Sequence, residues 1–171
     1  NGQRIARSIG SLALNNKFVR GDMVELDAVI GNTQFDAVIA TRALQQVKKM
    51  QTYKVIEKMQ NLTKPGGLNI ILAYIATPQQ QKQMPWRALL EPEELPGLYA
   101  KAGWSEVSYD YDLKPLDNSY NNLGCVSTGK LISRKPTVLE EVKRSLLRRA
   151  DYYRNSDPEY YNLLMEEADL Y

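Results

Sequence analysis

Residues 35–75 read as a strand, a helix and a second strand, and this unit constrains the fold more than any other part of the chain. An apolar run at residues 35–40 is followed by apolar residues at helical spacing from Val47 to Leu62, and a second apolar run ends at Ile75. Such runs predict buried strands of a parallel sheet, because strands covered on both faces lack polar alternation. Open α/β sheets bind ligands at the carboxyl ends of their strands. We therefore expect the functional edge at the loop of residues 40–44.

The composition limits the class of function. The chain has 171 residues, 25% of them charged and 43% hydrophobic, which is typical of one globular domain. A net charge of +2 does not indicate a nucleic-acid-binding protein, and no apolar run reaches the roughly 20 residues of a membrane span. There is no His, which excludes His-based triads, general bases and metal ligands, and we expect no metal site. Cys125 stands alone, so no internal disulfide forms and we expect a cytoplasmic protein.

Several short motifs follow one another in the order of a known family. Asp36 begins the first apolar run, and residues 64–67, Lys-Pro-Gly-Gly, precede the second. With these landmarks the chain resembles the class I S-adenosylmethionine-dependent methyltransferases, in which they mark the fourth and fifth strands, and within them the tellurite-resistance branch. In the same order, residues 18–22 resemble the third strand and its loop, residues 89–103 a late helix, and residues 104–112 and 125–133 the last two strands. The resemblance covers about residues 2–136.

This resemblance implies an α/β fold with a Rossmann-like sheet in the family order 3-2-1-4-5-7-6, the last strands being antiparallel. We expect strands at residues 17–20, 36–40, 68–75, 106–112 and 125–133, flanked by helices. The family binds its cofactor at a glycine-rich loop after the first strand, and this chain carries no such loop. We therefore interpret it as an N-terminally truncated or degenerate member. Residues 17–20 should then pair directly with residues 36–40, be bordered by another chain, or be poorly ordered.

The resemblance also implies S-adenosylmethionine as the cofactor, with Asp22, Met23, Thr41 and Arg42 at its binding site. In the family, an acid at the place of Asp22 accepts a hydrogen bond from the adenine amino group, a role that suits a carboxylate. The residues alone allow a second interpretation, a plain turn in which Asp22 bonds its own backbone. Thr41 and Arg42 lie either where cofactor and acceptor meet or in a solvent-facing loop. No catalytic residue is assigned, because methyl transfer depends mostly on orientation.

Two hypotheses of function remain open. The first is S-adenosylmethionine-dependent methyl transfer to a small-molecule acceptor in the complete protein, with the chain alone binding the cofactor weakly and inactive. Residues 114–122 lack the His and Arg that the tellurite-resistance branch carries in that loop, so tellurium and selenium substrates are not extended to this chain. Residues 84–87 are either part of a lid over the substrate or an anchor of their loop. The second hypothesis is a non-catalytic binding or scaffold module that docks a partner.

Residues 124–130, with the sequence GCVSTGK, match the pattern of a phosphate-binding loop. That motif needs a strand before it, a helix after it, and Ser or Thr after the Lys. Leu131 occupies the last of these positions, and we interpret the match as coincidence.

The last part of the chain, residues 137–171, reads as two helices appended to an α/β domain of residues 1–136. Thr137 with Glu140, and Ser156 with Glu159, have the spacing of capping boxes. The first helix has an apolar stripe, and the second has apolar residues of its own: Leu139, Val142, Leu146, Ala150 and Tyr153 in the first, and Tyr160, Leu163, Leu164 and Leu170 in the second. We expect Leu139, Val142 and Leu146 to be buried, either on the α/β domain or against Tyr160, Leu163 and Leu164. The segment is either a helical hairpin with complementary charged faces or an arm for a partner protein or self-association.

Overall fold

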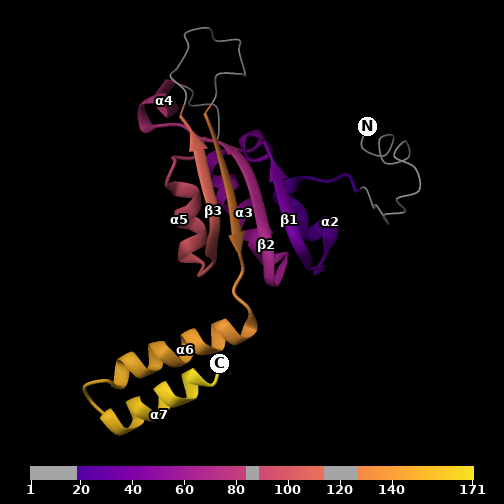
Figure 1. Cartoon of the computed structure of the whole chain (residues 1–171). Helices are drawn as coiled ribbons and strands as arrows, with labels where there is room; N and C mark the ends of the chain where they lie inside the picture. Colours follow the sequence, from indigo (N-terminus) through magenta and orange to yellow (C-terminus); the bar gives the residue numbers. More distant parts are fainter. Residues whose placement is uncertain (1–18, 84–88, 114–126) are drawn as a thin grey trace.

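A four-stranded sheet forms the centre of the protein. The structure, a computed structural model, describes residues 19–83, 89–113 and 127–171 (Figure 1). The strands are β1 (Phe35–Thr41), β2 (Thr63–Tyr74), β3 (Ser105–Asp112) and β4 (Thr128–Arg134), in the order β1-β2-β4-β3. β1 and β2 are parallel, and β4 is antiparallel to both of its neighbours. This arrangement confirms the expected family order for the fourth to seventh strands.

Helices cover one face of this sheet. α3 (Lys49–Asn61) buries Thr52, Val55, Ile56 and Met59, a set with helical spacing, and leaves Met50 on the outer side at 74% exposure. α5 (Glu94–Lys101) buries Leu95 and Tyr99 in the same hydrophobic core. Shorter elements complete the body: η1 (Met23–Glu25), α2 (Leu26–Ile30), η2 (Leu44–Gln46) and α4 (Pro78–Gln83). Within the described ranges, no helix is long and apolar enough to cross a membrane.

A buried polar network ties α3 and α5 to β2. The Thr63 hydroxyl lies 2.6 Å from Asn69 Oδ1, and Asn69 Nδ2 donates to the Tyr99 hydroxyl at 2.8 Å. All three side chains are almost fully buried, and burial raises the pKa of the Tyr99 hydroxyl well above its ordinary value. Because the side-chain polar atoms of these three residues are hydrogen-bonded, the network fixes the two helices on the sheet without a large desolvation penalty.

The expectation that both strands of the βαβ unit are buried is wrong for β1. Only Ala40 of this strand is buried, and Ile39 is 63% exposed. Val19 and Arg20 form no strand, so direct pairing with β1, one of the three arrangements expected for residues 17–20, is not seen in the described part of that segment. Residues 17 and 18 lie outside the described ranges. The edge of β1 away from β2 therefore has no described strand beside it.

The Lys-Pro-Gly-Gly landmark is expected to precede the second strand. In the structure, residues 64–67 instead lie within β2 (Thr63–Tyr74). β2 begins at Thr63, and the register with β1 shifts between Phe35 and Ala37. A Cβ on Gly67 would lie 2.8 Å from the backbone oxygen of Asp36, so only glycine permits this close approach. Lys64 Nζ also lies 2.9 Å from Asp36 Oδ1, and this hydrogen bond and the Lys64 charge lower the pKa of the Asp36 carboxyl. The two family landmarks thus contact each other.

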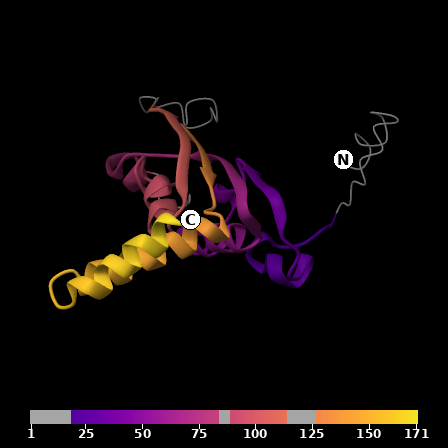
Figure 2. The same cartoon turned by 60° about the horizontal axis from the view of Figure 1, so that its bottom comes forward.

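Helices α6 (Val138–Tyr153) and α7 (Pro158–Asp169) form a hairpin that projects from the body, which confirms the expected helical pair (Figures 1 and 2). Leu146, Ala150, Leu164 and Ala168 are buried between them. The predicted capping box of Thr137 and Glu140 is present, but the second is wrong. Asp157, not Ser156, caps α7, because its side chain accepts from the Tyr160 backbone N–H at 3.0 Å and Pro158 occupies the first helical turn.

The expected burial is confirmed for Leu146 but is wrong for Leu139, which is exposed, and Val142 is half-buried. Leu139 lies near the start of α6, which is longer than α7, so the shorter helix does not cover that end. Leu163 and Leu170 are exposed as well, because helical spacing turns them away from Leu164 and Ala168 of the buried seam.

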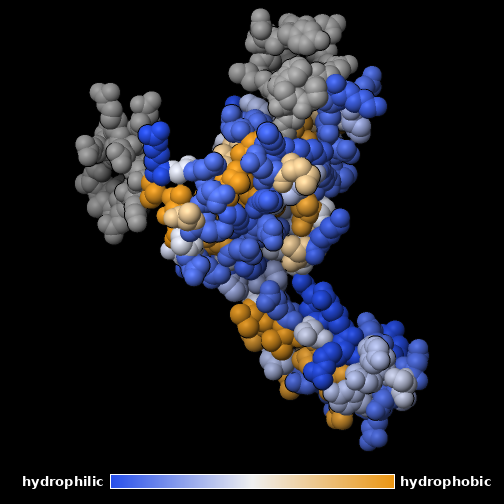
Figure 3. All heavy atoms as spheres, turned by 180° about the vertical axis from the view of Figure 1, so that it is seen from behind, coloured by the Kyte–Doolittle hydropathy of each residue, from blue (hydrophilic) through white to orange (hydrophobic). Residues whose placement is uncertain are grey.

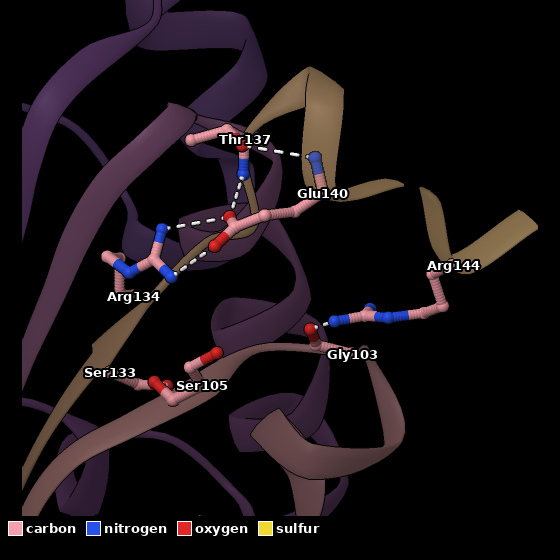
Figure 4. Close-up of polar contacts among 7 residues, drawn as sticks. All are labelled: Gly103, Ser105, Ser133, Arg134, Thr137, Glu140 and Arg144. Atoms are coloured by element: carbon pink, nitrogen blue, oxygen red, sulfur yellow. Dashed lines mark hydrogen bonds and ion pairs between the residues drawn. The ribbon is translucent and has the colours of Figure 1, made fainter. Parts of the chain in front are cut away.

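Two polar contacts fix the hairpin to the body (Figure 4). Arg134 at the end of β4 binds Glu140 through two hydrogen bonds of 2.7 and 2.9 Å, and Glu140 in turn accepts from the Thr137 backbone N–H at 2.7 Å. Arg144 Nη1 donates to the Gly103 carbonyl at 2.9 Å. A bidentate Arg–carboxylate pair holds one geometry better than a single contact does. These contacts therefore orient α6 relative to β4.

We expect the substitution Tyr99→Phe to lower the free energy of unfolding by about 1–3 kcal/mol, because it leaves the buried Asn69 amide without its acceptor. Urea denaturation followed by circular dichroism measures the change. Tyr111→Phe removes the same hydroxyl from an exposed side chain on β3 and should change stability by less than about 0.5 kcal/mol. Equal losses in the two variants would contradict the structural role of the network.

The contact between Arg134 and Glu140 should depend on pH. Hydrogen bonds from Arg134 and from the Thr137 backbone lower the pKa of Glu140 to about 2. A carboxylate with a depressed pKa in the folded state stabilises above its unfolded pKa, so the contact should persist at neutral pH and be lost as pH falls from about 4.5 to about 2. Amide exchange at Thr137 should show this loss. Glu140→Gln should remove this pH-dependent transition, and the control Glu141→Gln should retain it. If the transition is unchanged in Glu140→Gln, a group other than Glu140 causes it.

Candidate functional site

The carboxyl end of β1 carries the first sign of a site. Thr41 is the last residue of the strand, and Arg42 follows it with a φ of 49°. Arg42 is the one residue other than glycine with a positive φ among the described residues. Its backbone N–H donates to the Leu72 carbonyl at 2.7 Å, which holds the strained residue against β2. A non-glycine residue in this conformation costs of order 1–3 kcal/mol, and such residues cluster at ligand sites.

Gln45 lies beside Arg42 and has an unpaired polar atom. Its Nε2 donates to the Arg42 carbonyl, whereas its Oε1 is buried and has no hydrogen-bond partner among the described residues. A buried acceptor without a donor is costly, so a ligand N–H or O–H in this place would be stabilised. The loop after β1 therefore combines backbone strain with a free acceptor at the edge where parallel sheets bind ligands.

A cavity of about 500 Å³ lies beside the start of β1. Its wall is mostly apolar, with the carboxylate of Asp22 and the hydroxyl of Thr33 as the polar side chains; the lining residues are Val19, Gly21, Asp22, Met23, Leu26, Val29, Ile30, Thr33 and Phe35. The volume falls in the range of small-molecule sites. A Cβ on Gly21 would lie 2.3 Å from Val29 Cγ2, so a side chain here would displace the wall.

The structure gives Asp22 a local role and leaves one oxygen free. Asp22 caps η1, because its Oδ1 accepts from the Val24 backbone N–H at 2.9 Å. This is the turn interpretation of Asp22. The second carboxylate oxygen has no hydrogen-bond partner among the described residues, and the side chain is exposed at the cavity. The cap therefore does not exclude a ligand contact.

The four residues expected at the site fall into two groups. Asp22 and Met23 line the cavity, and Met23 also packs against the hydrophobic core. Thr41 and Arg42 do not line it and lie at the opposite end of β1 from Phe35. Two other expectations, the possible lid at residues 84–87 and the loop at residues 114–122, lie outside the described ranges. In the region matching a phosphate-binding loop, residues 128–130 belong to β4, and that strand continues to Arg134 without a helix.

A polar cluster between α3 and α5 was not predicted from the sequence. Tyr53 donates to Glu94 Oε1, and Lys49 Nζ lies 3.2 Å from Glu94 Oε2. Burial, the hydrogen bond to Glu94 and the Glu94 charge raise the pKa of Tyr53 to about 12. Burial opposes ionisation of Glu94, but hydrogen bonds from Tyr53, the Glu91 backbone and Lys49 outweigh it and lower the pKa of that carboxyl. The cluster therefore holds the two helices together rather than supplying an acid or base near neutral pH.

The only signal for this cluster in the sequence is the spacing of Lys49 and Tyr53, one turn apart on α3. It does not identify Glu94, which is far away in the chain. Within the described residues, no group of three or more acidic or Cys side chains could hold a metal ion.

Comparison with known proteins places the chain among methyltransferase-like proteins. The family described as "Tellurite resistance protein TehB" matches residues 5–126. Hemagglutinin 1 of Eikenella corrodens is 27% identical over 92 residues, which are 54% of this chain but only 30% of that protein. The chain thus spans less than a third of the length of this curated relative.

Two solved structures share the fold. The cyclase SpnF superposes with a TM-score of 0.59 at 15% identity, covering 79% of this chain and 61% of that one. Magnesium protoporphyrin IX methyltransferase (ChlM) of Synechocystis PCC 6803, with bound S-adenosylmethionine, gives a TM-score of 0.52 at 14% identity and covers 78% of this chain and 52% of that one. At these identities the likeness shows the fold alone.

We expect Arg42→Gly to be more stable than Arg42→Ala by roughly 0.5–1 kcal/mol. Glycine adopts the positive φ without strain, and this gain exceeds its greater flexibility in the unfolded chain, whereas alanine keeps the strain. Both variants remove the same guanidinium, so their difference isolates the backbone. Thermal unfolding of the two proteins measures it, and an alanine variant as stable as the glycine variant would show that residue 42 is not strained.

Proposed function

Because this chain belongs to the tellurite resistance protein TehB family of S-adenosylmethionine-dependent methyltransferases, we propose that it is part of an enzyme that methylates a small-molecule acceptor. The observation that carries the proposal is the family match over residues 5–126, together with a strand order that agrees with it. The acceptor itself is left unspecified, and the proposal does not extend to tellurium or selenium compounds.

The cavity at Asp22 fits the adenine end of S-adenosylmethionine. A flat heterocycle is suited to a wall of Val, Leu, Ile and Phe side chains, and its amino group is a donor for the free oxygen of Asp22. The close approach of Gly21 to Val29 leaves no room for a side chain at this part of the wall. Met23 supports the same wall from the core.

Thr41 and Arg42 are our candidates for contacts with the acceptor or with the methionine part of the cofactor. When bound, S-adenosylmethionine supplies a methyl group that is already activated, so the protein needs to hold the acceptor in line rather than to provide a strong base. Arg42 offers a fixed positive charge that would attract an anionic group of the acceptor or the cofactor carboxylate. Gln45 Oε1 would accept a hydrogen bond from the same ligand.

The proposal includes weak cofactor binding by this chain alone. The cavity at Asp22 and the loop after β1 lie toward opposite ends of that strand, and no glycine-rich loop in the chain joins the two. Cytoplasmic localisation is part of the same proposal, since a chain with a single Cys has no internal disulfide and the cofactor is a metabolite of that compartment.

A second candidate function is a non-catalytic scaffold that docks a partner through residues 137–171. The specific observation that favours it is the exposed apolar surface of the projecting hairpin. We also propose that the chain divides into two domains, residues 1–136 and residues 137–171.

Isothermal titration of the 171-residue chain with S-adenosylmethionine should give a dissociation constant weaker than about 100 μM, corresponding to less than roughly 5.5 kcal/mol of binding free energy. A low-micromolar constant would contradict the weak cofactor binding proposed for the chain alone.

The variant Asp22→Asn tests the proposed cofactor site. Ligand-observed NMR at millimolar cofactor concentration measures affinities as weak as these. Asn keeps an oxygen that can cap Val24 but loses the charge, so affinity should fall about tenfold while the melting temperature is unchanged. Asp151→Asn, which removes an exposed carboxylate on α6 away from the cavity, is the control and should bind normally. Equal binding by all three proteins would remove Asp22 from the site.

A further inference from the structure

The hairpin of α6 and α7 exposes more apolar surface than its size explains. Of the thirteen large hydrophobic side chains that are exposed in the described part of the chain, six lie in the hairpin: Val138, Leu139, Tyr152, Leu163, Leu170 and Tyr171. The buried seam between the helices contains two Leu and two Ala, and six partly buried hydrophobic side chains pack against it. Figure 3 shows hydrophobic side chains along the hairpin and at its junction with the body. A pair of helices with only four buried side chains between them gains stability when its exposed apolar surface is covered.

Helical spacing places most of these residues on one face. Val138 and Tyr152 are separated by about four turns of α6. Leu163 on α7 and Leu170, the helical C-cap residue of α7, are separated by about two turns, so each pair forms a stripe. Arg149, about three turns after Val138, donates to the Tyr160 hydroxyl at 2.7 Å, and Leu163 follows Tyr160 by about one turn. This contact shows that the two stripes lie on the same side of the hairpin. We call the four residues of the stripes the hairpin face.

The two helices carry opposite charges that are not neutralised within the hairpin. α6 and its C-cap residue Arg154 contain five bases and three acids, two of which lie in the first turn of the helix, and residues 157–169 contain five acids and no base. Both helices are described along their whole length, and no ion pair joins a base of α6 to an acid of α7. Arg149 bonds a neutral hydroxyl, and Arg154 pairs with Asp151 on its own helix. The opposite charges are thus available to a partner.

We infer that the hairpin face binds the same face of a second copy of this chain, with α6 of one copy against α7 of the other. A surface with one basic and one acidic half is self-complementary under a two-fold rotation. In that arrangement the apolar stripes cover each other, and Arg148 and Arg149 of one copy lie near Glu166 and Glu167 of the other. The result is a four-helix bundle.

The same charges disfavour other occupants. A partner with a surface of one sign would meet like charge on one of the two helices. An anionic membrane would attract α6 and repel α7. The contacts of Arg134 with Glu140 and of Arg144 with Gly103 hold the hairpin out from the body, which leaves its face accessible. The inference does not depend on methyl transfer.

Sedimentation equilibrium of the full chain tests the inference. We expect the wild type to change from monomer to dimer between about 1 and 200 μM, a range that corresponds to roughly 5–8 kcal/mol. Leu163→Glu combined with Leu170→Glu should keep the chain monomeric. The melting temperature at low concentration should not fall, because the two side chains are 58% and 82% exposed in the folded chain. Val107→Glu, at a 59% exposed position on β3, is the control and should dimerise as the wild type does.

Charge reversal gives a second, independent test. Arg148→Glu with Arg149→Glu should abolish the dimer, and so should Glu166→Lys with Glu167→Lys. When these two variants are mixed, every α6 meets an α7 of opposite charge, so a heterodimer should form with at least tenfold higher affinity than either homodimer. High salt should weaken the wild-type dimer.

Three results would overturn the inference. They are a wild type that stays monomeric at 200 μM, a dimer that survives the two leucine substitutions, and charge variants that remain monomeric when mixed. The mixing experiment also decides the matter if the leucine variant fails to fold.

Discussion

Strand β2 is hydrogen-bonded along both edges, and the rest of the structure depends on this double pairing. Its parallel partner β1 brings the loop after that strand to the carboxyl edge of the sheet, and its antiparallel partner β4 leads to the hairpin. The buried face of β2 presents Asn69, whose hydrogen bonds to Thr63 and Tyr99 fix α3 and α5 in place. One strand thus positions the candidate site, the helical layer and the C-terminal arm.

Irregular backbone is concentrated where the candidate site lies. Arg42 has a positive φ directly after β1, and the adjacent Gln45 has a buried acceptor without a donor. Both features lower stability. A loop that served only as a connection could avoid them by carrying other residues at these two positions. The regular part of the sheet supports them: the bond from Arg42 to Leu72 extends the pairing of β1 with β2 by one residue.

Two surface ion pairs have a different role in this protein, since they fix junctions between segments. Lys64 with Asp36 closes the irregular start of the β1–β2 pairing, and Arg134 with Glu140 fixes the turn from β4 into α6. An exposed ion pair contributes little to the free energy of unfolding. Its value here is geometric, because each pair selects one direction for the chain that follows. The direction of α6 decides which surface the hairpin leaves open.

The sequence by itself determined the order and type of the main elements: the apolar runs at β1 and β2, the helix between them, and the capping box at Thr137. These depend on local periodicity and on hydrogen bonds between residues near in the chain. Burial was decided only by the tertiary structure. Ile39 and Leu163 belong to apolar patterns but are exposed, since burial requires a neighbour that the pattern does not specify. The cluster of Lys49, Tyr53 and Glu94, and the cavity that includes Asp22 but not Arg42, likewise join residues far apart in the chain, and their proximity follows from packing alone.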